Sequence, residues 1–148
     1  MSPRHLRTAL VHSRLDEIRS LLDDLDRLGI VTVEDLTTDR FRRHVTERVL
    51  SAMVDLAVGV NSHVLATRGR VPADAASTFT AMAGAGVLAD RLAEDLVGSV
   101  GLRNAIVHEY ADVNLGFVAA AVPMARRRYG EYVRQVAAWT AANGSPGG

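Results

Sequence analysis

Apolar side chains recur along this chain at intervals of three and four residues. Its first long stretch carries Leu15, Ile18, Leu22, Leu25 and Leu28. This spacing puts apolar side chains on one face of an α-helix. Gly29 follows directly, and glycine readily takes the left-handed conformation that ends many helices. The sequence therefore predicts an amphipathic helix from about residue 4 to residue 28.

The same spacing, together with capping residues, predicts four further helices. Their expected ranges are 39–67, 73–83, 87–107 and 115–142. Thr38 or Asp39 is suited to cap the second of these five helices, and Asn114 the last. Pro123 should kink or split the last helix. The connector over residues 30–38 is rich in β-branched residues and is expected to be non-helical, with no partner strand evident.

The second of these helices has its own predicted buried face. This face consists of Val45, Val49, Ala52, Leu56, Val60 and Val64. Long helices with short connections predict an all-α fold, a four-helix bundle with one additional short helix. The 148 residues suit one domain, expected over residues 1–142, followed by a flexible tail over 143–148.

Charge and cysteine content narrow the possible chemistry. The chain has 17 basic and 17 acidic side chains, every basic one being arginine, and its formal net charge is zero. This balance argues against a nucleic-acid coat protein but allows a local basic cleft. With no cysteine, disulfides and thiolate catalysis are excluded. No signal peptide or unbroken apolar span of about 18 residues is evident, so we expect a cytoplasmic protein without a membrane partner.

One short segment at the end of the predicted helix over residues 87–107 combines a fixed cation with a titratable base. Arg103 offers a planar fork that suits phosphate, and His108 has a reference pKa of about 6.5, near working pH. On a regular helix the two side chains would point about 140° apart. If the helix ends near Val107, both could converge on one pocket. This pair could serve RNA cleavage without a metal or other cofactor, in which a 2′-hydroxyl attacks the adjacent phosphate.

A purely structural role for these two residues remains open from spacing alone. Histidine in a last helical turn often complements the helix dipole, and arginine often lies on a solvated face. Among the other histidines, His63 is the best additional site candidate, although a partly buried structural histidine is the alternative. The run Arg126-Arg127-Arg128 either contacts phosphate or a partner, or forms a solvated helix face. No spacing of residues indicates a metal site.

The segment Arg103-Asn104-Ala105-Ile106-Val107-His108-Glu109-Tyr110 resembles the Arg-x4-His-x-Tyr signature of HepT-like toxins in the HEPN superfamily. The resemblance extends upstream to Glu47-Arg48-Val49-Leu50, Asp55-Leu56-Ala57, Asn61, His63 and Arg68-Gly69. The order of the helices agrees over roughly residues 6–140. One departure is Val113-Asn114, where members of the family often have an Ile-Asp-like pair.

This resemblance implies a helical bundle that forms a homodimer, with two Arg/His motifs facing one cleft. It implies a metal-independent endoribonuclease toxin whose partner is an MntA-type nucleotidyltransferase antitoxin. Carried onto this sequence, Arg103 would stabilise phosphate and His108 would be the acid or base. Asn104 would support the site, and Tyr110 would be the residue that accepts AMP. The competing reading within the family is a non-catalytic HEPN module that docks a nucleotidyltransferase or a nucleotide.

Overall fold

The computed structural model describes residues 5–109 and 112–144, with the side chain of Glu109 excepted. These residues form α-helices and no strand, which confirms the predicted all-α class. The helices are α1 (Thr8–Leu28), α2 (Val33–Thr38), α3 (Arg40–Ala66), α4 (Ala75–Gly84), α5 (Asp90–Glu109) and α6 (Leu115–Asn143). The bundle is therefore made of four long and two short helices.

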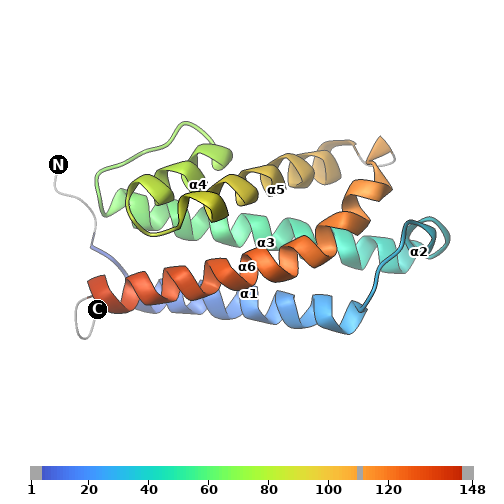
Figure 1. Cartoon of the computed structure of the whole chain (residues 1–148), viewed down its shortest axis with the longest axis horizontal. Coiled ribbons are helices and arrows are strands. Elements are labelled where there is room, and N and C mark those ends of the chain that lie inside the picture. The colour runs from blue at the N-terminus through green and yellow to red at the C-terminus, as the bar shows by residue number, and fades with distance from the viewer. Residues whose placement is uncertain (1–4, 110–111, 145–148) are drawn as a thin grey trace.

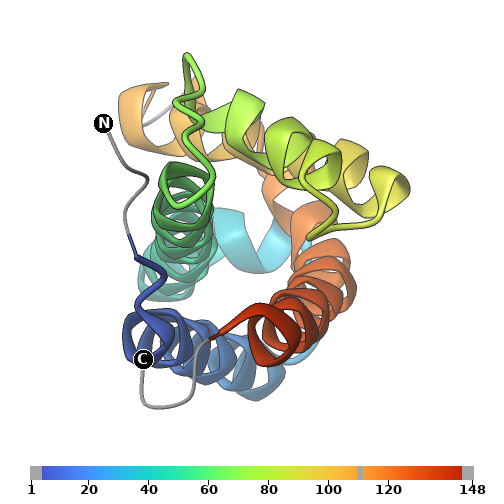
Figure 2. The same ribbon diagram turned by 90° about the vertical axis from the view of Figure 1, so that its left-hand side faces the viewer.

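The four long helices lie side by side along the long axis of the molecule (Figure 1), and they enclose the core. α1 packs on α3, α3 on α5, α5 on α6, and α6 back on α1. The short α4 lies on α3 and α5, and the short α2 closes one end against α3 and α6. Figure 2 shows α1, α3 and α6 nearly end-on, with α4 and α5 crossing above them.

Several helix ends lie where local sequence signals predicted them. α1 ends at Leu28, and Gly29 has a positive φ of 67°. The Asp39 side chain caps α3 by accepting a hydrogen bond from the Arg42 backbone at 3.0 Å. Asn114 caps α6 by accepting from the backbone of Gly116 at 2.9 Å. These side chains satisfy backbone N–H groups that have no partner within the first turn.

The prediction of a non-helical connector over residues 30–38 is wrong, because Val33–Thr38 form α2. A reciprocal capping box begins this helix. The Thr32 side chain accepts from the Asp35 backbone at 3.1 Å, and the Asp35 carboxylate accepts from the Thr32 backbone at 3.0 Å. These two bonds favour a helical turn in spite of the β-branched residues around it.

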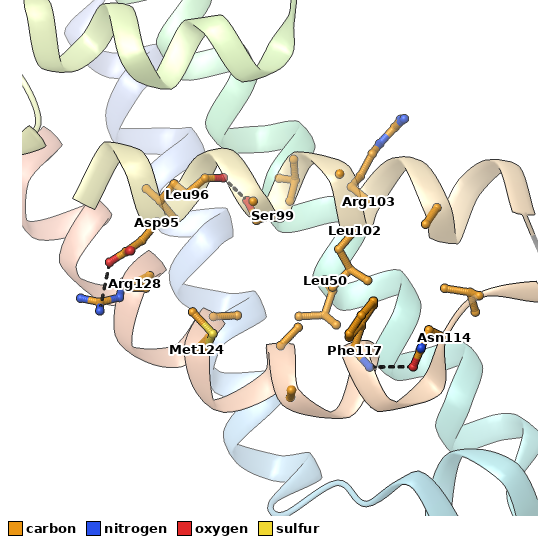
Figure 3. A pocket seen from close by; sticks show the side chains of 18 of the residues that line it. Leu50, Asp95, Leu96, Ser99, Leu102, Arg103, Asn114, Phe117, Met124 and Arg128 are labelled. Atoms are coloured by element: carbon orange, nitrogen blue, oxygen red, sulfur yellow. Dashed lines mark hydrogen bonds and ion pairs between the residues drawn. The ribbon is translucent and has the colours of Figure 1, made fainter. Parts of the chain in front are cut away.

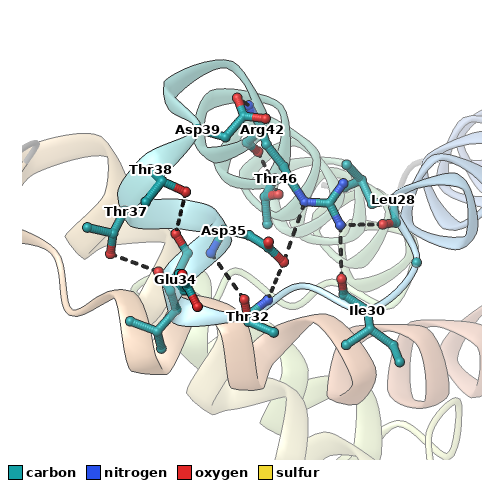
Figure 4. A network of polar contacts seen from close by, with 12 residues as sticks. Leu28, Ile30, Thr32, Glu34, Asp35, Thr37, Thr38, Asp39, Arg42 and Thr46 are labelled. Carbon is teal, nitrogen blue, oxygen red and sulfur yellow. Dashed lines mark hydrogen bonds and ion pairs between the residues drawn. The ribbon is translucent and has the colours of Figure 1, made fainter.

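An arginine from α3 holds this short helix against the end of α1 (Figure 4). Arg42 Nη2 donates to the carbonyl oxygens of Leu28 at 2.6 Å and Ile30 at 2.9 Å. Its Nε lies 3.8 Å from the Asp35 carboxylate. Arg42 of α3 therefore binds carbonyls at and just after the end of α1, where the helix leaves such groups unpaired, and the carboxylate of Asp35 in α2.

The two last helices differ in detail from the prediction. α5 begins at Asp90, later than the expected residue 87, and continues to Glu109 instead of ending near residue 107. α6 remains one helix in spite of Pro123. Figure 1 shows its first turns directed away from the rest of the helix, which is the bend that an internal proline causes.

The core contains an aromatic cluster and a buried polar group. Phe79 packs edge-on to Tyr132, with ring centroids 6.1 Å apart. The Tyr132 hydroxyl lies 2.6 Å from the Asn61 side-chain oxygen, and the Asn61 amide donates to the Thr78 hydroxyl at 3.1 Å. Asn61 and Tyr132 have no exposed surface. Their hydrogen bonds allow these polar atoms to lie in the core.

The predicted buried face of α3 is only partly correct. Its buried apolar residues are Val49, Leu50, Met53, Val54, Ala57, Val60, Val64 and Leu65. Val45, Ala52 and Leu56 are only partly buried. Because α3 contacts each of the other five helices, its buried face is broader than a single stripe.

Among the described residues, α3 is also the one helix long and apolar enough to cross a membrane by length and composition. More than half of its apolar window (56%) is buried inside the bundle. The packing of α3 against all five other helices accounts for this composition.

Candidate functional site

Arg103 projects from α5 toward α3, where it meets a carboxylate that sequence spacing did not single out as its partner. Its Nε donates to Asp55 Oδ1 at 2.9 Å. Its Nη1 lies 3.4 Å from the Asn104 side-chain oxygen, a long hydrogen bond. The Arg103 side chain is 28% exposed and that of Asp55 is 52% exposed. The guanidinium is therefore held at the surface of the bundle, where solvent and ligands can reach it.

The structure brings Arg103 and Asn104 into contact, but it keeps His108 on another side of α5. The side chains of Arg103 and His108 could converge within one chain only if the helix ended near Val107. In this described segment, α5 instead remains helical through His108 to Glu109. On a regular helix, five positions correspond to about 140° of rotation and about 7.5 Å of rise. His108 and Asn104 are exposed. Arg103 and His108 are thus accessible from different directions.

Tyr110, the residue predicted to accept AMP, lies outside the described residues. Its position relative to Arg103 and His108 stays a prediction. Asn114, on the other side of this gap, is described and caps α6.

An apolar cavity of about 630 Å³ lies beside Arg103, between α5 and α6 (Figure 3). Leu50 of α3, Leu102 of α5 and Phe117 of α6 face one another across it in Figure 3, whereas Arg103 extends away from it. Phe117 is 68% exposed and Met124, also in its wall, is 44% exposed. Exposed large apolar side chains around a cavity are typical of a surface that another molecule covers.

Two polar contacts border this cavity. Arg128 of α6 pairs with Asp95 of α5 at 3.0 Å. The hydroxyls of Ser99 and Tyr129 lie 2.6 Å apart. Burial raises the pKa of the Tyr129 hydroxyl well above its ordinary value, so it stays protonated at neutral pH. Both contacts join α5 to α6 and fix the wall of the cavity.

The other candidates from the sequence have structural contacts. His63 Nε2 accepts from the Arg7 backbone at 2.9 Å, just before α1 begins. The three arginines of the run 126–128 have different surroundings. Arg126 binds the end of α1, Arg127 is exposed, and Arg128 forms an ion pair with Asp95 of α5. Arg126 Nη2 donates to the carbonyl oxygens of Leu25 and, at 2.8 Å, Gly29. Arg126 and Arg128 thus hold helices together, and neither is part of a fully solvated face.

Within the described part of the chain, no group of three or more His, Asp or Glu side chains is placed to hold a metal ion. The groups available there for chemistry beside α5 are a guanidinium, an imidazole, a carboxamide and a carboxylate. The guanidinium and carboxamide can bind phosphate, and the imidazole, exposed in another direction, can transfer a proton.

Comparison with known proteins connects this geometry to a family. The model of the family described as Ribonuclease HepT-like matches residues 15–136. The tRNA nuclease HepT of Aphanizomenon flos-aquae (strain 2012/KM1/D3) is 29% identical over 135 residues, which cover 89% of this chain and 90% of that protein.

Solved structures share the fold at lower identity. A tri-AMPylated HEPN toxin of Shewanella oneidensis, in complex with an MNT antitoxin, has a TM-score of 0.79 and 18% identity, covering 87% of this chain and 97% of that one. YutE of Bacillus subtilis, described as a cytosolic protein of unknown function, has a TM-score of 0.83 and 9% identity, covering 95% of both chains. At these identities the similarity establishes the fold alone.

Proposed function

The chain belongs to the ribonuclease HepT-like family, and on that premise we propose that it is an RNA-cleaving toxin whose catalytic residues are Arg103 and His108. The main support is the accessible guanidinium of Arg103, which is held by an ion pair with Asp55. The exposed His108 follows Arg103 by five positions. We propose tRNA as the substrate class, because the relative from Aphanizomenon flos-aquae is named a tRNA nuclease. The expected location is the cytoplasm.

The proposed reaction needs a base, a cation and an acid. A base removes the proton from a ribose 2′-hydroxyl, and the oxygen attacks the adjacent phosphorus. The bond to the 5′-oxygen breaks, and an acid gives that oxygen a proton. His108 supplies proton transfer, and Arg103 stabilises the added negative charge on the phosphate. The products are a 2′,3′-cyclic phosphate and a 5′-hydroxyl, and no metal ion is required.

We propose that two copies of the chain form the site. One copy presents Arg103 and His108 in directions about 140° apart, so a single copy does not bring both side chains to the same phosphate. The exposed Phe117 and Met124 beside the α5–α6 cavity provide an apolar surface that a second copy would cover. We propose that the twofold axis of this dimer brings Arg103 of one copy close to His108 of the other.

Control by AMP is the second part of the proposal. An MntA-type nucleotidyltransferase would act as antitoxin by transferring AMP from ATP to Tyr110. The tyrosine oxygen would attack the α-phosphorus, lose its proton and displace pyrophosphate. The tri-AMPylated HEPN toxin bound to an MNT antitoxin supports this relationship in a protein of the same fold. An AMP group two residues from His108 would add negative charge where the RNA phosphate has to bind.

The test is cleavage of tRNA in excess EDTA by protein whose intact mass shows no AMP. We expect cleavage that leaves 2′,3′-cyclic phosphates, and its loss in Arg103→Ala and His108→Ala. Arg19→Ala and His12→Ala are matched controls, because both residues are on α1 with exposed side chains. The controls should cleave at the wild-type rate.

A lack of cleavage by unmodified wild-type protein, across transfer, ribosomal and messenger RNA, would contradict the proposed activity. The non-catalytic module that docks a nucleotidyltransferase would then be the better account. Cleavage that EDTA abolishes would contradict metal independence but leave the nuclease assignment intact.

A further inference from the structure

We infer that Asp55 is a positioning residue for the proposed cleavage reaction, acting through Arg103. The inference rests on the proposed function and adds to it a residue from a different helix. Asp55 is on α3 and Arg103 is on α5, 48 positions apart in sequence. Their Oδ1 and Nε atoms are 2.9 Å apart. This bond fixes the direction in which a long, flexible side chain leaves α5.

The donor that Asp55 uses decides what Arg103 can still bind. Asp55 takes the Nε–H, the donor nearest the backbone. Nη1 has only the 3.4 Å contact to Asn104, and the described residues provide no hydrogen-bond partner for Nη2. The two terminal nitrogens therefore remain available as a fork for two phosphate oxygens. Figure 3 shows Arg103 extending away from the apolar cavity, which leaves this fork open to a ligand.

Positioning is a better account of Asp55 than direct contact with substrate. Its carboxylate carries the same sign of charge as RNA phosphate and would repel it. Its contribution to folding is small, because an ion pair between side chains 28% and 52% exposed is screened by solvent. What the bond does provide is a guanidinium whose freedom is reduced before the substrate arrives.

Such a role predicts an effect on the rate of cleavage with little effect on binding. Asp55→Ala should lower the single-turnover rate on tRNA on the order of tenfold, because the guanidinium is no longer aligned with the transition state. The RNA concentration that gives half the maximal rate should change by less than about twofold, since the charge of Arg103 is retained. Binding of an uncleavable 2′-O-methyl RNA, measured by fluorescence anisotropy, should likewise be unchanged or slightly tighter.

Asp55→Asn distinguishes orientation from charge. The amide oxygen of asparagine can accept the same Nε–H bond without a negative charge, so this variant should recover most of the rate. Glu131→Ala is the matched control. Glu131 is a 41% exposed carboxylate on α6 that accepts from Arg134 Nε at 3.1 Å, and its loss should leave cleavage unchanged. Circular dichroism would verify that each variant is folded.

The outcomes separate this inference from the proposed function. If wild type cleaves, Arg103→Ala does not, and Asp55→Ala cleaves at the wild-type rate, the inference is wrong and the nuclease assignment stands. Asp55→Asn as slow as Asp55→Ala would also overturn it, because negative charge, rather than the hydrogen bond, would then be what matters. Wild-type protein that cleaves no RNA would contradict the nuclease assignment, and this inference with it.

Discussion

The buried hydroxyl of Tyr132 offers a prediction whose size follows from its contacts. A hydroxyl has one hydrogen to donate, and the nearer acceptor is Asn61 Oδ1 at 2.6 Å, with the Ala57 carbonyl at 3.1 Å. Tyr132→Phe removes this hydrogen bond, worth about 1 kcal/mol, and leaves a buried amide oxygen unpaired at a further 1–3 kcal/mol, both as rough values. We therefore expect a loss of about 2–4 kcal/mol in the free energy of unfolding.

The assay is urea unfolding followed by circular dichroism at pH 7. The midpoint should fall without a change in the denaturant slope, since the surface exposed on unfolding is nearly unchanged. Burial holds the pKa of Tyr132 well above its ordinary value, so its hydroxyl stays protonated and the loss should be the same at pH 6 and pH 9. Tyr129→Phe is the matched control in the same helix. It should cost less, because the Ser99 hydroxyl that it frees still bonds the Leu96 carbonyl at 2.6 Å.

A double-mutant cycle tests whether Asn61 holds the Tyr132 hydroxyl. In an Asn61→Ala background the acceptor is gone, so Tyr132→Phe should cost at least about 1 kcal/mol less than in wild type. Additive losses, or a single-variant loss below about 0.5 kcal/mol, would refute the claim that this hydroxyl is held by Asn61.

Three further predictions concern the end of α1, the start of α2 and the exposed apolar surface. Arg126→Met keeps the apolar stem but removes the bonds to two carbonyls, so the unfolding free energy should fall by about 2 kcal/mol in the same urea assay. Hydrogen bonds from the Thr32 backbone and side chain lower the pKa of Asp35, so its stabilisation is present above its unfolded pKa and is lost as the pH falls through its folded pKa. The Tm difference between wild type and Asp35→Asn should therefore be present at pH 6 and shrink as the pH falls below the unfolded pKa of aspartate, whereas a constant difference would contradict it. Phe117→Arg should shift the sedimentation coefficient from dimer toward monomer while leaving circular dichroism unchanged.

Local signals predicted the parts of the fold that neighbouring residues determine. Gly29, Asp39 and Asn114 end or begin helices through their own backbone or side-chain geometry, and all three were identified. The signal for α2 was also present, as Thr32 and Asp35 three positions apart. It was missed because the β-branched residues around it suggested extended backbone.

The candidate site was predictable only in part, because its contacts cross between helices. The segment from Arg103 to His108 could be identified from the sequence, whereas the Asp55 partner depends on how α3 packs against α5. The structural role of Arg126 likewise depends on a contact 97 positions away. Spacing along one helix does not contain this information.

In the proposed dimer, Arg103 of one copy acts with His108 of the other. Arg103→Ala and His108→Ala proteins, each inactive alone, should be mixed under conditions that exchange subunits, with native mass spectrometry to verify mixed dimers. Random exchange makes about half of the dimers mixed, and each of these has one intact Arg103–His108 pair across the interface. We predict that tRNA cleavage returns in proportion to the mixed dimer. Mixed dimers that cleave no RNA would contradict a site shared between two chains.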